Sequence, residues 1–170
     1  MKNNARDIAL KYLSSRDRTA KEIEKHLKEK GCTEEEIVET INFLIEEHFI
    51  DDDDFCRRYI LYGIEKGRGP LRLERELVEK GVSAEKVRMC LCAEFDRERE
   101  QELASELAHR LLKNTIDNTG DKIQSEGTDS GAAGVNKKSL ARIARRLASQ
   151  GYHTDIIYEV IGKLGFDSEI

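Results

Sequence analysis

One short stretch, which occurs three times in altered form, constrains this chain more than any other feature of its sequence. Between Gly67 and Gly81 the chain reads GRGPLRLERELVEKG, with Leu73 and Leu77 four residues apart, the spacing of one helix face. A glycine-proline pair suits the start of a helix, and Gly81 can adopt the left-handed conformation that ends it. Arginines follow the opposite side. The stretch therefore predicts a short helix with a buried leucine face and an exposed basic face.

The same stretch recurs on both sides in the sequence. A shift of 50 residues carries it back to a segment in which Ile23 and Leu27 take the leucine positions and Glu-Lys-Gly again ends the helix. A shift of 70 residues carries it forward to a segment in which Leu147 and Gly151 match Leu77 and Gly81. Matched positions at both shifts indicate an internal repeat, with a longer gap before the third copy.

Each copy lies inside a unit of three short amphipathic helices with its own caps. In the first copy, Asn4 is expected to cap the opening helix. The capping boxes TAKE from Thr19 and TEEE from Thr33 open the next two helices. By correspondence, Asp54 is expected to cap the first helix of the second copy, and Ser139 the middle helix of the third.

The repeats predict an all-α fold of three tandem three-helix repeats that form an elongated, curved array. The expected borders are residues 1–50, 51–101 and 102–170. Three helices of this size bury little surface alone, so stacking against neighbouring repeats is the usual source of their stability.

Two further expectations concern the second and third repeats. The first helix of the second repeat is expected to bury Phe55, Tyr59 and Tyr62. The first helix of the third repeat extends back toward Glu94, and residues 114–136, rich in Gly, Ser, Asp and Asn, are predicted to be a disordered insertion.

The net charge of −5 hides a strong asymmetry. Residues 1–54 hold nine basic and fifteen acidic side chains, residues 55–92 hold nine basic and five acidic ones, and residues 137–150 hold five basic ones and no acid. Basic faces on two equivalent helices indicate a polyanion or an acidic protein surface as partner, although a solvated helix face is the alternative explanation. The candidate contact residues are Arg57, Arg58, Arg68, Arg72, Arg75, Lys137, Lys138, Arg142, Arg145 and Arg146.

Catalytic and metal-binding patterns are absent from the sequence. Pro70 stands where a Walker-type phosphate loop would need a backbone N–H, and the four histidines lack metal-ligand spacing. The acidic run from Asp51 lacks the spaced ligands of a calcium loop. We therefore expect a protein that is not an enzyme, has no catalytic residues, and needs no cofactor or metal.

The apolar runs are too short for a signal peptide or a membrane span, which predicts a cytoplasmic protein without a membrane partner. The four cysteines are then expected to be buried, reduced thiols. Nothing in the sequence points to a stable homo-oligomer, so a monomer is expected.

Several of these motifs together resemble the RecX family of regulatory proteins. The likeness rests on the three tandem repeats, on LKEKG at the end of the first repeat's middle helix, on DDDDFCRRYI, and on KGRGPLRLERELVEKG. It covers nearly the whole chain outside residues 114–136, which depart from the family pattern. The resemblance implies a protein that modulates the recombinase RecA: it lies in the groove of the RecA filament on single-stranded DNA, suppresses ATP hydrolysis and strand exchange, and hinders filament growth. The overall acidity argues for weak direct DNA binding.

Two other functions fit the same sequence. The short helices and glycine turns are similar to a helix-turn-helix, as in a sequence-specific DNA-binding protein. A helical-repeat scaffold for an unrelated protein is the second alternative. Single-strand binding by base stacking is not supported, because no aromatic residues interleave with the basic ones.

Overall fold

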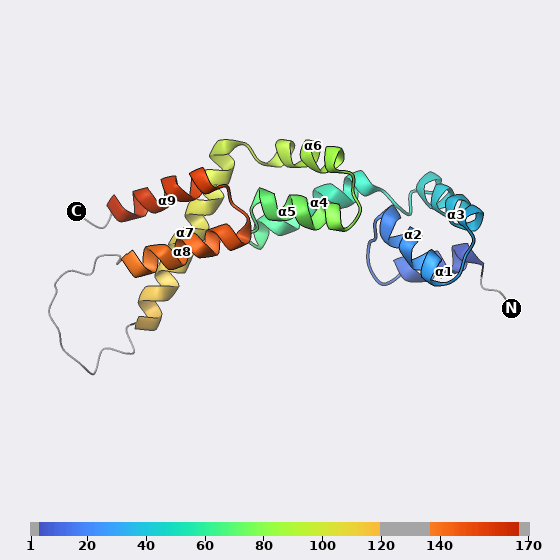
Figure 1. The fold of residues 1–170 in the computed structure, drawn as a ribbon, viewed down its shortest axis with the longest axis horizontal. Helices are drawn as coiled ribbons and strands as arrows, with labels where there is room; N and C mark the ends of the chain where they lie inside the picture. Colours follow the sequence, from blue (N-terminus) through green and yellow to red (C-terminus); the bar gives the residue numbers. More distant parts are fainter. Residues whose placement is uncertain (1–3, 120–136, 167–170) are drawn as a thin grey trace. The chain divides into compact units, whose positions relative to one another are not determined.

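The computed structural model describes residues 4–119 and 137–166, which form nine helices and no strand (Figure 1). This confirms the all-α prediction. The helices are α1 (Ala5–Leu13), α2 (Ala20–Glu29), α3 (Glu34–Glu46), α4 (Asp52–Glu65), α5 (Pro70–Glu79), α6 (Ala84–Glu94), α7 (Arg97–Thr119), α8 (Lys137–Gln150) and α9 (Thr154–Phe166).

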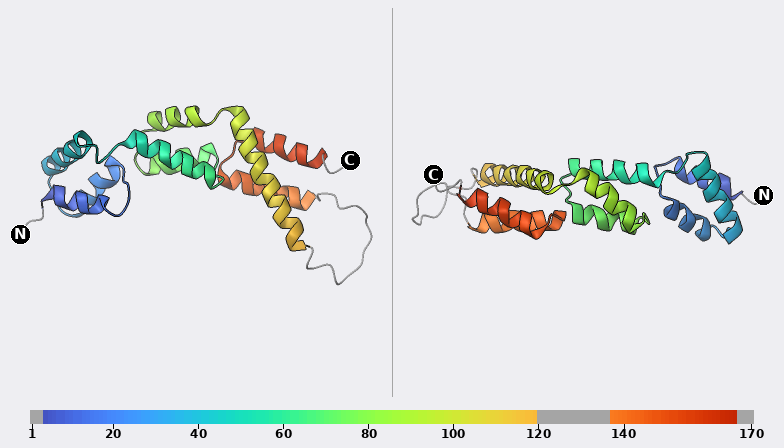
Figure 2. Two further views of the ribbon diagram at one scale, coloured as in Figure 1. Left: turned by 180° about the vertical axis from the view of Figure 1, so that it is seen from behind. Right: turned by 90° about the horizontal axis from the view of Figure 1, so that it is seen from above.

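The chain divides into two compact units. One contains the described residues of 1–62 and 74–93, and the other contains those of 63–73 and 94–170. The division runs through α4 and α5, so each unit includes part of the second predicted repeat. Figure 2 shows α1, α2 and α3 gathered within the first unit, and α7, α8 and α9 packed against one another within the second.

The predicted caps of the first repeat are present. The Asn4 side chain accepts a hydrogen bond from the Arg6 backbone N–H. The Thr19 and Thr33 hydroxyls each accept from the N–H three residues on, and the glutamate at that position accepts from the cap's own N–H. Both capping boxes are therefore complete.

The caps expected in the later repeats are wrong. The Asp51 carboxylate, not that of Asp54, caps α4, because its Oδ1 accepts from the N–H groups of both Asp53 and Asp54 at 3.0 Å. Four consecutive aspartates offer the same side chain, so the sequence leaves the choice open and the helix starts earlier than expected. Ser139 lies inside α8, which begins at Lys137.

The buried face of α4 also differs from the prediction. Cys56 and Ile60 are fully buried, whereas Tyr62 is 51% exposed. The next position on the buried face is Gly63, where a Cβ atom would overlap the Leu73 side chain. A glycine thus lets α5 approach α4 closely, and this packing, rather than the aromatic spacing, decides which side of α4 is buried.

The glycines predicted to end the middle helices adopt left-handed backbone conformations. The φ angles are 79° at Gly31 and 89° at both Gly81 and Gly151. Residues other than glycine rarely adopt positive φ angles of this size. The repeated helix stop is confirmed.

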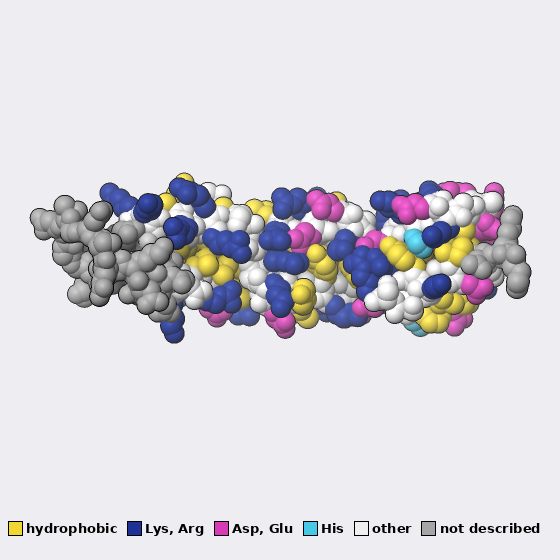
Figure 3. Space-filling view, turned by 90° about the horizontal axis from the view of Figure 1, so that it is seen from below, with side chains coloured by type: hydrophobic (Ala, Val, Ile, Leu, Met, Phe, Trp, Pro, Cys, Tyr) yellow, Lys and Arg dark blue, Asp and Glu magenta, His cyan; other side chains and the backbone are white. Residues whose placement is uncertain are grey.

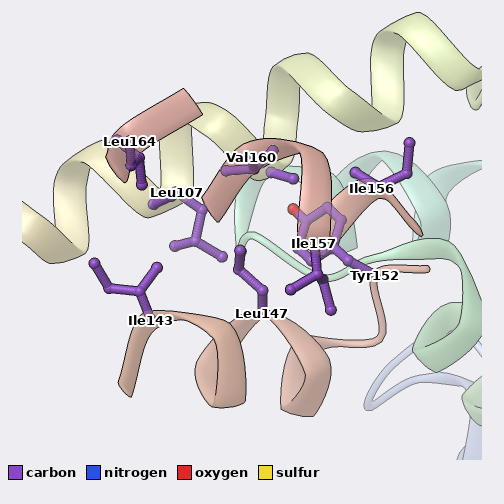
Figure 4. Packing of buried hydrophobic residues seen from close by; sticks show 10 residues of the cluster. Leu107, Ile143, Leu147, Tyr152, Ile156, Ile157, Val160 and Leu164 are labelled. Carbon is purple, nitrogen blue, oxygen red and sulfur yellow. The ribbon is translucent and has the colours of Figure 1, made fainter. Parts of the chain in front are cut away.

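Each unit has its own hydrophobic core. The first, from α1 to α3 and the turn before α4, consists of Ala5, Ala9, Ile23, Leu27, Ile37, Leu44 and Ile50. The second joins α7, α8 and α9 (Figure 4), where Leu107 of α7 faces Ile143 and Leu147 of α8, with Val160 of α9 beside them. Both cores contain the leucine and isoleucine positions that the repeat identified.

Helix α7 begins at Arg97, three residues after the Glu94 toward which the sequence extended it, and the predicted border between residues 101 and 102 falls inside it. It ends at Thr119, so its last turns include residues 114–119. The remainder of the predicted insertion, residues 120–136, lies outside the described residues.

Candidate partner-binding surface

Helix α8 presents a basic face opposite its buried one. Ile143 and Leu147 face the core, while basic side chains on the other sides of the helix are exposed. None of these basic side chains forms an ion pair with another described residue, so their charge faces solvent. The set is Lys137, Lys138, Arg142, Arg145 and Arg146, all predicted from the sequence. Dark blue Lys and Arg side chains cover much of the face drawn in Figure 3.

Arg72 is placed by a junction between α8 and α5 inside the second unit. The N–H groups of Gly69 and Leu71, at the start of α5, donate to the carbonyl oxygens of Gln150 and Gly151 at 2.8 and 3.0 Å. The Arg72 guanidinium donates to the Gln150 side-chain oxygen at 3.1 Å. Carbonyl groups at the end of α8 therefore accept hydrogen bonds from the free N–H groups at the start of α5. The Arg72 cation lies at the negative end of the α8 dipole. Arg72 is half-buried and has a structural partner.

The fit at this junction depends on glycine. A Cβ atom on Gly69 would lie 2.6 Å from the Gly151 carbonyl carbon and oxygen, closer than real Cβ atoms approach. An equivalent junction lies in the first unit, where the Thr19 hydroxyl donates to the Lys80 carbonyl oxygen at 2.5 Å. The end of one middle helix thus meets the start of another in both units.

Arg75 of α5 is exposed and forms no ion pair with another residue in the described part of the chain. Leu71 and Val78, which lie one turn away on either side, are 45% and 43% exposed. Arg68, at the turn before α5, is half-buried. The exposed face of α5 is therefore partly apolar and carries one outward cation.

Arg57 and Arg58 of α4 are exposed but have acidic neighbours. Arg58 contacts Asp17 at 2.7 Å and Asp54 at 2.9 Å, and Arg57 lies 4.0 Å from Asp54. These ion pairs partly neutralise both arginines in the free protein. Both are therefore less available to an outside anion than the exposed cations of α8.

The sequence analysis missed Lys25. A shift of 50 residues places Lys25 of α2 on Arg75, and a shift of 70 places Arg75 on Arg145. Lys25 is exposed and forms no ion pair with another described residue. Residues 1–54 are acidic in total, so the charge count did not single out Lys25. Its alignment with Arg75 in the repeat could have identified it.

The neighbours of Lys25 on α2 are already paired. Glu24 accepts from both Lys21 and Lys28 at 2.8 Å, and these hydrogen bonds lower the pKa of the Glu24 carboxyl. The same pairing, with a smaller contribution from Glu34, raises the pKa of Lys28. Lys25 is therefore the cation of this face most available to an outside anion.

Other chemistry is limited among the described residues. No three His, Cys, Asp or Glu side chains there could hold a metal ion together, and no described helix is long and apolar enough to cross a membrane. Cys56 is buried as expected, and burial raises the pKa of its thiol to about 12. Cys32 and Cys90 are half-buried and Cys92 is exposed, which corrects the prediction that all four thiols are buried.

A polar hollow of about 610 Å³ lies in the first unit. An ion pair between Glu22 and Lys80 at 3.7 Å crosses its lining, and the Tyr59 hydroxyl donates to Glu76 at 3.0 Å. These groups already satisfy one another, so the hollow offers no activated nucleophile.

Comparison with known proteins identifies the family. Residues 5–44 match the family described as "RecX, first three-helix domain", and residues 51–91 match "RecX, second three-helix domain". Regulatory protein RecX of Clostridium botulinum is 30% identical over 156 residues, which are 92% of this chain and 66% of that protein. The crystal structure of RecX from Lactobacillus salivarius matches with a TM-score of 0.73 and 26% identity over 95% of both chains.

The chain belongs to the RecX family. Regulatory protein RecX of Oceanobacillus iheyensis, 27% identical over 163 residues, is matched over 95% of this chain and 54% of its own length. The chain thus spans about half to two thirds of the length of several curated RecX proteins. The resemblance inferred from the repeats is confirmed, and the family is one of regulatory proteins.

Proposed function

We propose that this RecX chain binds the RecA filament on single-stranded DNA and inhibits its ATP hydrolysis, growth and strand exchange. Such a protein would restrain recombination and the SOS response without being an enzyme. The proposal includes a cytoplasmic monomer that needs no cofactor and binds naked DNA weakly.

The observation that carries the proposal is the basic face of α8. Five exposed cations stand on one helix without an acidic residue in that helix and without an ion pair to another described residue. Unpaired cations on a rigid helix attract phosphates or acidic protein surfaces by long-range electrostatics. Membership of a family of regulatory proteins supports RecA as the source of that surface.

The proposed role of the ten predicted residues is electrostatic positioning and not base readout. Lys25, Arg75 and Arg145 stand at equivalent positions of three middle helices. We include Lys25 for that reason, and we expect Arg57 and Arg58 to contribute less than the cations of α8 because of their ion pairs.

The test is inhibition of RecA ATP turnover by a variant with Arg75, Arg142 and Arg145 changed to glutamate. Arg72 is left intact because it bonds Gln150. We expect at least a tenfold (about 1.4 kcal/mol) loss of inhibitory potency. Circular dichroism should show unchanged helical content, since all three side chains are exposed.

A matched control carries the same charge change elsewhere. Lys11, Lys113 and Lys163 are exposed basic residues outside the candidate set, and their change to glutamate should leave inhibition within about twofold of the wild type. Full inhibition by the first variant would remove the assignment of this surface. Tight binding to one duplex sequence without RecA would favour the helix-turn-helix function, and no effect of the wild-type chain on RecA would favour a scaffold for another protein.

A further inference from the structure

The outer face of α3, in the first unit, exposes large apolar side chains. Val38 and Ile45 are seven residues apart, two turns along one side of the helix, and are 52% and 47% exposed. Phe49, just beyond the helix, is 54% exposed. We call Val38 and Ile45 the α3 face. Phe49 lies toward another side, because its ring is 6.4 Å from that of Phe43, which is about 140° around the helix from Val38.

The second repeat shows that the fold does not require an apolar side chain at the position of Val38. A shift of 50 residues places Val38 on Arg88, whereas Ile45 falls on Phe95. Arg88 is exposed on α6 and lies 3.6 Å from Glu74. The second repeat therefore accommodates a charged side chain at the position that Val38 occupies in the first. Exposed apolar area of this kind is unfavourable in water and marks interaction sites when it is clustered.

Acidic side chains flank the α3 face along one side. Helix α3 contains five acidic residues and no basic one. Glu35, Glu39 and Glu46 are exposed and form no ion pair with another described residue. A partner must therefore offer apolar side chains flanked by positive charge.

We propose that the α3 face is a docking site for an amphipathic helix of a partner protein, with an apolar stripe flanked by lysine or arginine. Helix-on-helix docking of this kind uses anchors at the spacing of Val38 and Ile45. Charge complementarity argues against two other occupants: a second copy docked through the same face would bring two acidic rims together, and a nucleic acid would be repelled. This inference goes beyond the proposed function, because the basic residues proposed to contact the RecA filament do not form this face.

The test uses a fluorescently labelled synthetic peptide of about 18 residues, five helical turns, with leucines at i, i+3, i+4 and i+7 and flanking lysines. Binding is followed by anisotropy with the full chain, without RecA or DNA. We expect saturable binding that weakens at least tenfold in Val38→Arg. That variant copies the residue of the second repeat, and its fold can be checked by circular dichroism.

Two controls sharpen the test. Met89→Arg introduces the same side chain at a 69% exposed apolar position of α6 and should leave peptide binding unchanged. A peptide with flanking glutamates in place of lysines should bind at least tenfold more weakly.

Any of four results would overturn the proposal: no binding of the lysine peptide, equal binding to Val38→Arg, equal binding of the glutamate peptide, or self-association of the wild type that Val38→Arg abolishes. The last result would make the face a contact between copies. None of them depends on inhibition of RecA, so failure here is separate from failure of the proposed function.

Discussion

At the scale of single residues, two neighbouring aspartates have opposite roles at the start of α4. Hydrogen bonds from the backbone N–H groups of Asp54 and Asp53 lower the pKa of the Asp51 carboxyl. Burial raises the pKa of Asp52, although its carboxylate accepts from the Ala20 N–H at 3.0 Å. The first carboxylate stabilises the fold when charged, and the second does so more when protonated.

We expect Asp51→Ala to lower the free energy of unfolding by about 1 kcal/mol at neutral pH, because α4 loses its cap. Asp54→Ala removes only exposed ion pairs and should lower it by less than about 0.5 kcal/mol. Urea denaturation at pH 7 measures both changes. A larger effect of Asp54→Ala would show that the cap is misassigned.

The same two residues predict opposite pH dependences. Because the Asp51 pKa is lowered on folding, its contribution is complete above the unfolded pKa and is lost as pH falls through the folded one. Because the Asp52 pKa is raised, its charged form destabilises the fold above the folded pKa, and this effect fades as pH falls toward the ordinary value of 3.8.

Asp52→Asn keeps an oxygen that can accept from Ala20 and removes the buried charge. We expect it to raise the free energy of unfolding at pH 7 by about 0.5 kcal/mol, the low end of the range for burying a polar group. The gain should vanish below about pH 3.8, where Asp52 is protonated in both states. Thermal melts across pH 3 to 7 test this, and a loss of stability at pH 7 would contradict it.

At the scale of elements, the end of one middle helix meets the start of another, and glycine makes this contact close. Gly151 combines a φ of 89° with contact to the backbone of Arg72. Gly31 has a similar φ of 79°, but a Cβ atom there would meet nothing within 4 Å. Substitution of Gly31 would therefore introduce backbone strain alone, whereas substitution of Gly151 would add steric overlap.

Gly151→Ala should therefore destabilise the second unit by about 3 kcal/mol or more, from strain plus overlap. Gly31→Ala should cost only the strain, about 1 kcal/mol. Chemical denaturation of both variants provides the comparison. Equal losses would mean that the junction yields to accommodate a Cβ atom.

At the scale of the whole molecule, the chain has one large core in each unit. Leu147 is fully buried in the core of α7, α8 and α9, and Leu44 is fully buried in that of α1 to α3. In repeat proteins each unit contributes its own stability together with terms from its nearest neighbours. A cavity in one core should therefore lower the stability mainly of its own unit.

We expect Leu147→Ala to cost about 2–5 kcal/mol, the usual range for a buried leucine. Amide hydrogen exchange should accelerate in α7, α8 and α9 and much less in α1 to α3. Leu44→Ala serves as the reciprocal variant. Uniform acceleration over all helices in either variant would show a single cooperative molecule.

Much of the fold was predictable from sequence, because its determinants are local. The capping boxes at Thr19 and Thr33 and the stop at Gly81 depend on residues within one helical turn. The fully buried Leu73 and Leu77 follow from four-residue spacing. The repeat then indicated three such units, and their motifs carried the resemblance to the RecX family.

The candidate surface was predictable only as a list of basic residues. Sequence placed Arg58 and Arg145 in the same set, yet Arg58 pairs with Asp17, 41 positions away, while Arg145 has no ion pair with another described residue. Lys25 was hidden by the acidic total of its segment, although the repeat places it on Arg75.

By itself, the sequence determined the helices, their glycine stops and the buried leucine positions, since each depends on neighbours a few residues apart, and its motifs carried the resemblance to the family. Tertiary structure decided that Arg72 bonds Gln150, that Arg58 pairs with Asp17, and which cations face solvent. Those outcomes depend on the distance between side chains far apart in sequence, and that distance exists only after the helices have packed.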